Sequence, residues 1–447
     1  MNDLTLEIQN FGPINEAKID INKINVIAGK NASGKTTASK LLYCLLASAS
    51  SDGDYLSNWS IINNLRPVLF NIWNNLGRGA GADRFIDYYY RLDSDNVYFN
   101  KDGTPITEIY QKILNEFNNL EFKDKESYWA KFDEIENLFK INENSEEYYG
   151  NIMDSLLDLE FDGQEQISNY FFEDTLIHFY GSNDAGKKFK NVITTKDTKI
   201  VTNLNHDYWD NLGSNEVSYL ETPYILDFIN CIDIDLPYYR GSNFHQKLLM
   251  KKLRLNLNKE DIYDKFLNKK LIEVQEKITD LLSGKFDFNQ NSHEFEYKKN
   301  NRTFSTRNTA SGLKQLGIIQ LLLENRKLAQ NGYLLMDEPE VHLHPEWQIR
   351  LAEILVLLAK ELNIRICINS HSPQFIEAIE VYSASYDIRN DVNFYLSEAK
   401  EENGKFNISK IDRNDLIKIY DCLGKPYDEI DKIRGEIDAK YTIKGRG

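Results

Sequence analysis

Eight consecutive residues match the phosphate-binding pattern G-x-x-x-x-G-K-[ST]. They are Gly29, Lys30, Asn31, Ala32, Ser33, Gly34, Lys35 and Thr36, and Thr37 follows directly. In such a loop, backbone N–H groups and the start of the next helix hold phosphates, and the lysine reaches the β- and γ-phosphates. The hydroxyl of Thr36 is the expected Mg²⁺ ligand. The sequence therefore predicts a nucleotide site in which Lys35 takes part in the chemistry.

Two acids that follow an apolar run are further candidates. Asp337 and Glu338 end the run 333–336, which has the composition of a buried strand. Asp337 can hold Mg²⁺, directly or through water, and Glu338 can orient or deprotonate the attacking water. The alternative is a pair of acids at a solvated strand end, and the phosphate loop in the same chain favours the chemical interpretation.

A histidine and a serine complete the set of candidates. The segment that begins at Arg365 has the pattern of another buried strand and leads to His371, which can contact the γ-phosphate or its water as a neutral donor. The alternative for His371 is a histidine that merely ends a strand. Ser311 precedes a helical pattern at 316–323 and can cap that helix, whose N-terminus can bind an anion. An ordinary N-cap is the alternative for Ser311.

The elements around the phosphate loop have the required order. Residues 24–28 form a short apolar run before the loop, and 37–46 read as a helix after it, so strand, loop and helix follow one another. Residues 4–8 and 17–21 predict two further strands, 224–228 another, and 286–297 a hairpin around 289–292. We expect a composite head of residues 1–50 and 220–447, and an inserted lobe of residues 51–219 that is acidic, mostly helical and contains some strands.

The composition excludes some functional classes. The 447 residues carry a formal net charge of −16, so no overall positive field draws the chain to nucleic acid or anionic membranes. Four cysteines are scattered without a C-x-x-C pair, which disfavours a zinc site and is typical of a reducing compartment. No signal peptide and no apolar run long enough to span a bilayer is evident. We expect a soluble, cytoplasmic protein with no membrane partner.

Four segments occur in an order that resembles the ATPase heads of ATP-binding-cassette type. They are the phosphate loop, Ser-Gly-Leu-Lys-Gln at 311–315, Leu-Leu-Met-Asp-Glu-Pro-Glu at 334–340 and Asn-Ser-His-Ser-Pro at 369–373. Residues 337–345 are most similar to a branch that contains OLD-family ATPases, RecF-like proteins and antiphage-defence ATPases such as PtuA and AriA. The signature departs from the Leu-Ser-Gly-Gly-Gln of transporters, and the middle lobe, 51–219, carries no resemblance.

The resemblance implies a fold, a ligand and partners. It implies an α/β head with a mixed sheet that binds ATP and Mg²⁺. Ser311 and Gly312 would act on ATP held by a second copy, so that ATP lies between two heads in a homodimer, and His371 would be the switch histidine. It further implies slow, regulatory hydrolysis that controls a separate effector protein, in antiviral defence.

Two other functions remain as alternatives. A RecF-like repair ATPase would bind DNA, and the basic stretch 247–254 is the candidate surface for it. A self-contained nuclease would need a metal site at Asp287, Glu296 and Lys298, or the R-x4-H pattern of Arg240 and His245. The first nuclease pattern falls on an alternating hairpin whose polar residues face water, and the second arises readily by chance.

Overall fold

A computed structural model gives the fold of the chain. It describes residues 4–444 except for 78–81, 93–105, 123, 141–145, 162–166, 168, 183–187, 197–198, 204–215, 228–243, 256–268 and 401–403. Arg240 and Cys231 therefore lie outside the described residues.

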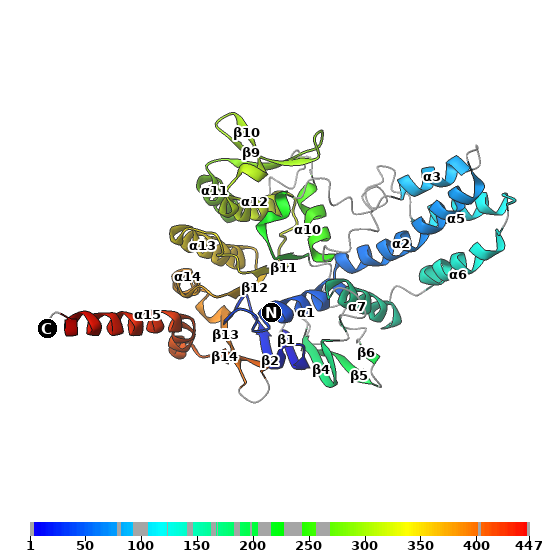
Figure 1. Cartoon of the computed structure of the whole chain (residues 1–447). Helices are drawn as coiled ribbons and strands as arrows, with labels where there is room; N and C mark the ends of the chain where they lie inside the picture. The colour runs from blue at the N-terminus through cyan, green and yellow to red at the C-terminus, as the bar shows by residue number, and fades with distance from the viewer. Residues whose placement is uncertain are drawn as a thin grey trace.

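A mixed sheet forms the centre of the molecule (Figure 1). Within the described residues it has eleven strands in the order β6-β5-β4-β1-β2-β14-β13-β3-β12-β11-β7. The strands are β1 (Leu4–Phe11), β2 (Ile14–Ile21), β3 (Ile24–Gly29), β4 (Phe171–Ser182), β5 (Lys188–Lys196), β6 (Lys199–Asn203), β7 (Val217–Leu220), β11 (Tyr333–Asp337), β12 (Arg365–Ser370), β13 (Val392–Ala399) and β14 (Phe406–Ile411). This mixed sheet, covered by helices, confirms the α/β class.

The half of the sheet that carries the phosphate loop is parallel. β3 pairs with β13 and β12, β12 with β11, and β11 with β7, all in parallel. The registers align Ala28 with Ser370 and Asn369 with Asp337. The carboxyl ends of parallel strands lie at one edge of a sheet, where ligands of open α/β folds bind. Residues from three distant parts of the sequence therefore meet there.

Alternating side chains of these strands enter two hydrophobic cores, because successive residues of a strand point to opposite faces. Leu334 and Met336 belong to one core, together with α11 (Lys269–Leu282), α12 (Ser311–Glu324), α13 (Pro345–Glu361) and α14 (Pro373–Ser385). Tyr333 and Leu335 belong to the other, together with α1 (Lys35–Ser48), α7 (Glu146–Glu160) and α10 (Phe244–Arg254). The sheet is thus buried on both faces.

A small antiparallel sheet lies over α12. It consists of β8 (Lys285–Asn289), β9 (Glu294–Lys299) and β10 (Arg302–Ser305) in the order β10-β9-β8. The predicted hairpin at 286–297 is confirmed, since Phe286 pairs with Tyr297 and Phe288 with Phe295. The strand predicted at 224–228 is wrong where the structure describes it, because Pro223–Asp227 is the 3₁₀ helix η1.

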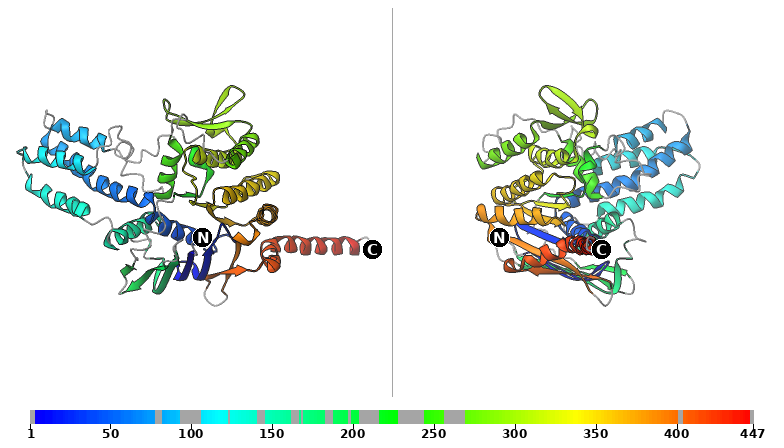
Figure 2. Two further views of the ribbon diagram at one scale, coloured as in Figure 1. Left: turned by 180° about the vertical axis from the view of Figure 1, so that it is seen from behind. Right: turned by 60° about the vertical axis from the view of Figure 1, so that its left-hand side comes forward.

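The inserted lobe is smaller than the expected 51–219. Its helices are α2 (Ser51–Leu76), α3 (Ala82–Arg91), α5 (Ile106–Asn118) and α6 (Glu126–Lys140), and they share a hydrophobic cluster of their own. Figure 2 shows these helices extending from the head. By contrast, β4, β5 and β6 continue the main sheet from β1, and β7 pairs with β11. The alternating apolar residues of β4, such as Ile177 and Phe179, are buried in the head core, so this segment belongs to the head.

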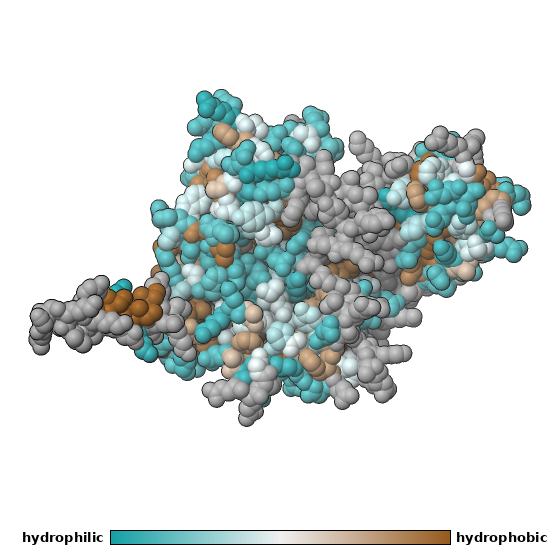
Figure 3. Space-filling view, viewed as in Figure 1, coloured by the Kyte–Doolittle hydropathy of each residue, from teal (hydrophilic) through white to brown (hydrophobic). Residues whose placement is uncertain are grey.

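The last described element is a long helix, α15 (Ile417–Lys444). Its first turns pack against α14, and Ile419 lies in the head core. The rest projects from the head (Figure 1), and Ile430, Ile433 and Ile437 are exposed on it. Figure 3 shows a hydrophobic patch on this projecting part.

Candidate active site

The phosphate loop joins β3 to α1 in a conformation that its glycines permit. Gly34 precedes the first residue of α1 with a φ of 85°, a left-handed value that glycine adopts without strain. A Cβ atom at Gly34 would also lie 2.9 Å from Ile14 Cγ1. The loop residues 29–36 and Thr37 therefore occupy the strand-to-helix turn that the sequence predicted.

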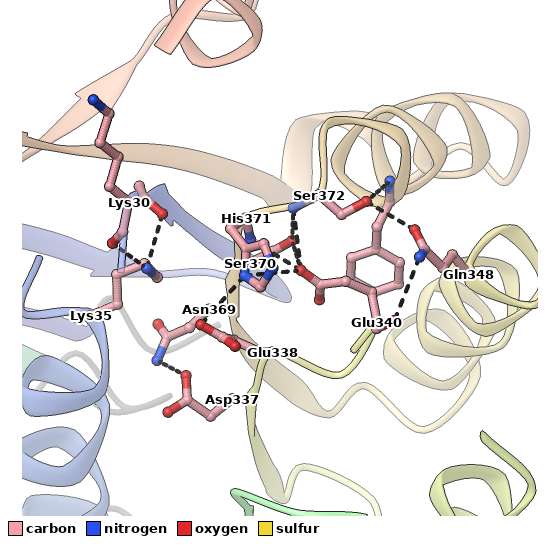
Figure 4. A network of polar contacts seen from close by, with 12 residues as sticks. Lys30, Lys35, Asp337, Glu338, Glu340, Gln348, Asn369, Ser370, His371 and Ser372 are labelled. Carbon is pink, nitrogen blue, oxygen red and sulfur yellow. Dashed lines mark hydrogen bonds and ion pairs between the residues drawn. The ribbon is translucent and has the colours of Figure 1, made fainter. Parts of the chain in front are cut away.

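Lys35 is folded back across this loop (Figure 4). Its Nζ donates hydrogen bonds to the carbonyl oxygens of Gly29 at 2.9 Å and Lys30 at 2.7 Å. Burial lowers the pKa of Lys35, and the nearby carboxylates of Glu338 and Asp337 oppose that shift. The arrangement places a desolvated cation where phosphate oxygens would replace the loop carbonyls as acceptors.

Thr36 and Asp337 meet although 301 positions separate them. Thr36 Oγ1 donates to Asp337 Oδ2 at 2.6 Å, and Asn369 Nδ2 donates to Asp337 Oδ1 at 2.9 Å. Burial raises the pKa of Asp337, and the bonds from Thr36 and Asn369 oppose that rise. A hydroxyl beside a carboxylate is an oxygen donor set that fits Mg²⁺. Mg²⁺ is commonly held by one or two protein oxygens together with substrate phosphates, and this pair suits that arrangement.

Glu338 and His371 face each other at the same sheet edge. His371 Nδ1 lies 3.3 Å from Glu338 Oε1, and both side chains are partly exposed. Glu338 has a φ of 46°, and its N–H donates to the carbonyl of Asn369 at 2.9 Å. Left-handed backbone at a residue other than glycine is uncommon, and such strain is concentrated at functional sites. The two side chains can together hold a water molecule for attack, with the carboxylate as base.

Glu340 is a site residue to which sequence analysis gave no role. It is buried, and its Oε1 accepts hydrogen bonds from Ser370 Oγ at 2.6 Å, His371 N at 3.0 Å and Ser372 N at 3.2 Å. Burial raises the pKa of Glu340, and the bonds from Ser370 and His371 oppose the rise. One carboxylate oxygen thus fixes the backbone turn that carries His371. The sequence signal for Glu340 was its place in the segment 334–340. Its contact with this turn depends on the pairing of β11 with β12, which the segment alone does not show.

Replacing Glu340 tests this positioning role. We expect Glu340→Ala to lower the kcat of ATP hydrolysis up to about 10²-fold, because His371 loses its fixed orientation, while ATP affinity changes little. Stability should fall by about 1–3 kcal/mol, since buried donors lose their acceptor. Glu340→Gln keeps one acceptor oxygen and should retain more activity. Equal activity of the two variants, or a comparable loss of ATP affinity, would contradict the role.

Two more residues support the site from distant positions. Ser397 Oγ of β13 donates to the carbonyl of Ser33 at 2.7 Å and holds the back of the phosphate loop. Asn369 also donates to Ser39 Oγ of α1 at 2.9 Å, which ties β12 to the loop helix. Ser397 has no sequence signal of this role. Asn369 stands in the segment 369–373, but its contacts, like that of Ser397, arise from strand pairing between remote segments.

Ser311 and Gly312 lie in the first turn of α12, which follows the small sheet along the chain. The structure does not place Ser311 at the N-cap as expected, since Ala310 is the cap residue and no side chain caps the helix. Gly312 is packed so closely that an added Cβ would lie 2.4 Å from Leu343 Cδ2. Figures 1 and 2 show α12 well separated from α1 of the same chain. The segment is therefore not part of the phosphate loop's own surroundings.

His342 and His344 have local structural roles. His344 is the N-cap of α13 and its Nδ1 accepts from Glu346 N at 3.4 Å. His342 has a φ of 64°, and its ring centre lies 6.1 Å from that of Tyr224.

The first nuclease pattern is a surface ion cluster. Lys298 Nζ lies 2.9 Å from Asp287 Oδ2 and 3.8 Å from Glu296 Oε2, on the polar side of the β8–β9 pair. Phe286 and Tyr297 alternate with these residues and are buried. The lysine already pairs with the acids, so this geometry supports the interpretation as a solvated hairpin face.

The second pattern includes a residue outside the described ones, Arg240, and a buried one, His245. His245 Nδ1 lies 2.6 Å from Glu160 Oε2 and its Nε2 lies 3.2 Å from Glu221 Oε2. Its side chain is 0% exposed, and its ring centre lies 4.5 Å from that of Tyr219. Both ring nitrogens are engaged inside the head core, so His245 has no access to a substrate. Its role is structural, joining α7, β7 and α10.

This buried cluster predicts a pH-dependent stability. Burial favours a lower pKa for His245, but Glu160 and Glu221 raise it to about 9. A histidine with a raised pKa stabilises the fold fully below its unfolded value of about 6.5, and this contribution is lost as the pH rises toward 9. We expect His245→Gln to cost about 3 kcal/mol of unfolding free energy near pH 6, and much less near pH 9.

Urea unfolding across this pH range checks the prediction. His178→Gln is the control, because His178 is partly exposed beside Glu7. A constant difference in unfolding free energy between wild type and His245→Gln would rule out a charged histidine.

The basic stretch 247–254 differs from the expected DNA-binding surface. Lys252 is buried in α10, its Nζ lies 3.4 Å from Glu216 Oε2, and it donates to the carbonyl of Val217. Part of the positive charge of this stretch therefore pairs with groups inside the head and is not available on the surface. The structure gives no support to this stretch as a continuous basic surface.

No helix among the described residues is long and apolar enough to cross a membrane.

Comparison with known proteins gives one decisive match. Residues 4–376 match the AAA ATPase domain family. No curated protein matches significantly. Among solved structures, the chain is similar to an SMC head domain from Thermotoga maritima, with 11% identity, a TM-score of 0.39 and coverage of 92% of this chain and 100% of that chain. It is also similar to an Smc head bound to the C-terminal domain of ScpA, derived from Pyrococcus furiosus, with 11% identity, a TM-score of 0.42 and coverage of 97% and 100%. Since the family match spans most of the sequence, the chain belongs to the AAA ATPase domain family and is an ATPase.

Proposed function

We propose that the protein binds ATP with Mg²⁺, dimerises around it and hydrolyses it slowly to control a partner. The observation that carries the ATP site is the meeting of Thr36, Asp337 and Asn369 beside the Glu338–His371 pair. Three parallel strands bring these residues together with the phosphate loop.

The residues divide the work of hydrolysis. The loop N–H groups and Lys35 bind the phosphates, with Lys35 exchanging its bonds to the loop carbonyls for phosphate oxygens. Thr36 and Asp337 would hold Mg²⁺, which neutralises charge that develops on the phosphates. Asn369 keeps the Asp337 carboxylate oriented toward Thr36. Glu338 takes the proton of the attacking water, and His371 donates to the water or the γ-phosphate.

The dimer completes the site in this proposal. Ser311 begins α12, a fourteen-residue helix whose N-terminal N–H groups suit an anion. Since α12 and α1 lie apart within one chain, Ser311 and Gly312 would reach the ATP of a second copy. Two equivalent sites then form across one symmetric interface.

Mixing two inactive variants tests the shared site. Lys35→Ala removes the phosphate lysine, and Ser311→Arg blocks the surface that closes on the partner's ATP. In a mixed dimer, one site has an intact Lys35 from one chain and an intact Ser311 from the other. We expect each variant alone to be inactive and an equal mixture to recover about one quarter of wild-type turnover. Failure of the mixture to exceed either variant would reject the shared site.

The resemblance to antiphage-defence ATPases supports a role in controlling a separate effector during antiviral defence. Cells that carry this chain with its neighbouring genes should lower phage plating, and Lys35→Ala should abolish that protection. Equal protection by the Lys35→Ala variant, or hydrolysis of DNA or RNA by the purified chain alone, would reject this role.

A further inference from the structure

A rigid hairpin tip presents positive charge above α12. Asn300 and Asn301 link β9 to β10 with φ values of 49° and 58°. A two-residue turn with both residues left-handed matches the twist of a hairpin and fixes its register. Lys299 and Arg302 flank the turn and are direct cross-strand partners. Both are exposed at the end of the small sheet.

Across the β9–β10 pair, each of these two cations faces the other rather than an acid. Like charges directly opposite each other destabilise an antiparallel pair. The acids Asp287 and Glu296 pair with Lys298 on the opposite face of the sheet. Arg307 adds a third exposed cation, in the 3₁₀ turn η3 (Thr306–Asn308) that follows β10. In a chain with a net charge of −16, this local repulsion points to an anionic ligand.

An exposed aromatic ring accompanies these cations. Phe304 is 42% exposed, whereas Tyr297, its cross-strand partner, is buried. Lys299, Arg302 and Phe304 share a face of the hairpin with Tyr297, because cross-strand partners and alternate residues of a strand do. Tyr297 is buried against the head, and the Phe304 ring centre lies 6.3 Å from that of Tyr297, so the exposed part of this face is its outer edge, formed by the other three residues. Figure 3 shows a largely hydrophilic surface over β9 and β10. An aromatic ring among cations is the chemistry that binds single-stranded nucleic acid.

We propose that the β9–β10 hairpin binds single-stranded nucleic acid. Lys299, Arg302 and Arg307 contact phosphates, and a base stacks on Phe304. A single strand is favoured because its bases are free to stack on a protein ring, whereas those of a duplex are stacked on each other. An acidic protein segment would use the cations and leave Phe304 without a role. This site is separate from the ATP site and does not depend on the proposed dimer.

Fluorescence anisotropy of the full chain with labelled strands of about 30 nucleotides tests the site. Three phosphate contacts predict that affinity for a single strand falls about 20-fold between 50 and 200 mM salt. The double variant Lys299→Gln, Arg302→Gln keeps one contact, so its affinity should fall only about threefold over the same range. Single-stranded DNA and RNA are compared, and a duplex should bind more weakly than both.

Phe304 separates stacking from charge. Phe304→Ala should weaken binding about 5- to 150-fold without changing the salt dependence, and Phe304→Tyr should bind like wild type. The matched control is Lys188→Gln, Lys190→Gln, which removes two exposed cations from β5 and should leave binding unchanged. None of these variants should change ATP turnover in the absence of nucleic acid.

Four binding results would overturn the proposal, and a fifth result concerns ATP turnover. The four are no binding at 50 mM salt, the same loss in the β5 control, equal affinity for the duplex, and displacement by polyglutamate combined with an unchanged Phe304→Ala affinity. The last result would assign the hairpin to an acidic protein. Loss of basal ATP turnover in the hairpin variants would assign the cations to the nucleotide and also overturn the site.

Discussion

Glu338→Gln is expected to bind ATP and then retain it. The carboxylate lies 3.3 Å from His371 and one residue after Asp337, the proposed metal ligand, so it is placed to take the proton of the attacking water. Glutamine has nearly the same shape but cannot accept that proton. Loss of a general base lowers turnover by about 10²- to 10⁴-fold. Binding should persist, because Lys35, Thr36 and Asp337 are unchanged.

Trapped ATP should also stabilise the dimer. With ATP and Mg²⁺, light scattering after gel filtration should give Glu338→Gln twice the mass of a monomer, while the wild type returns to monomer as ATP is consumed. Glu346→Gln is the control, since Glu346 is an exposed residue in the first turn of α13. Unchanged turnover in Glu338→Gln would reject the role as base, and a trapped monomer would reject only the dimer.

The parts of the site that follow contiguous motifs were predictable from the sequence. The phosphate loop carries its own strand, glycines and helix, so its conformation depends mainly on local residues. Asp337 and Glu338 follow from an apolar run that ends in acids. In each case, a short segment contains both the element and the residue it positions.

Residues that act through strand pairing were not predictable. Asn369 and Ser397 reach Asp337 and Ser33 only because β12 and β13 lie on either side of β3 in the sheet. Strand order is a tertiary property, and no spacing in one sequence encodes it directly. The same reason explains the lobe boundary, since β4 is remote from β1 in sequence and yet pairs with it.

His245 shows the limit of a short pattern. Two residue types at a fixed spacing suggested a nuclease, but burial decides the role of a histidine, and burial depends on α7 and β7. Glu160 is the last residue of α7 and Glu221 directly follows β7, and the two engage both nitrogens of the ring. The alternating hairpin at 286–297 was a safer prediction than this pattern, because the alternation of apolar and polar residues directly indicates which side chains face the core.

Lys35→Ala is expected to abolish nucleotide binding at ordinary concentrations. Lys35 is 4% exposed, and its ammonium group donates hydrogen bonds only to two loop carbonyls in the contacts described above. The folded chain therefore holds a desolvated cation that can bind phosphate oxygens. Each charge-assisted hydrogen bond contributes about 1.5–3 kcal/mol. The loss of two such bonds to phosphate should therefore weaken the affinity for ATP by a factor of about 100 or more. Lys35→Arg should bind ATP more tightly than Lys35→Ala but more weakly than wild type, since a planar guanidinium group does not reproduce the compact charge of the lysine ammonium group.

Lys30→Ala is the control that distinguishes the effect of the Lys35 charge from an effect on the conformation of the loop. Lys30 contributes its carbonyl oxygen to Lys35, and Figure 4 shows its own side chain directed away from that bond. We therefore expect a loss of less than about tenfold in Lys30→Ala, because backbone groups carry the loop's contribution. Titration with a fluorescent ATP analogue measures both variants, with thermal unfolding to confirm that each is folded. Wild-type affinity in a folded Lys35→Ala protein would show that phosphates bind elsewhere, and equal losses in the two variants would show that the loop's conformation, rather than the Lys35 cation, had been tested.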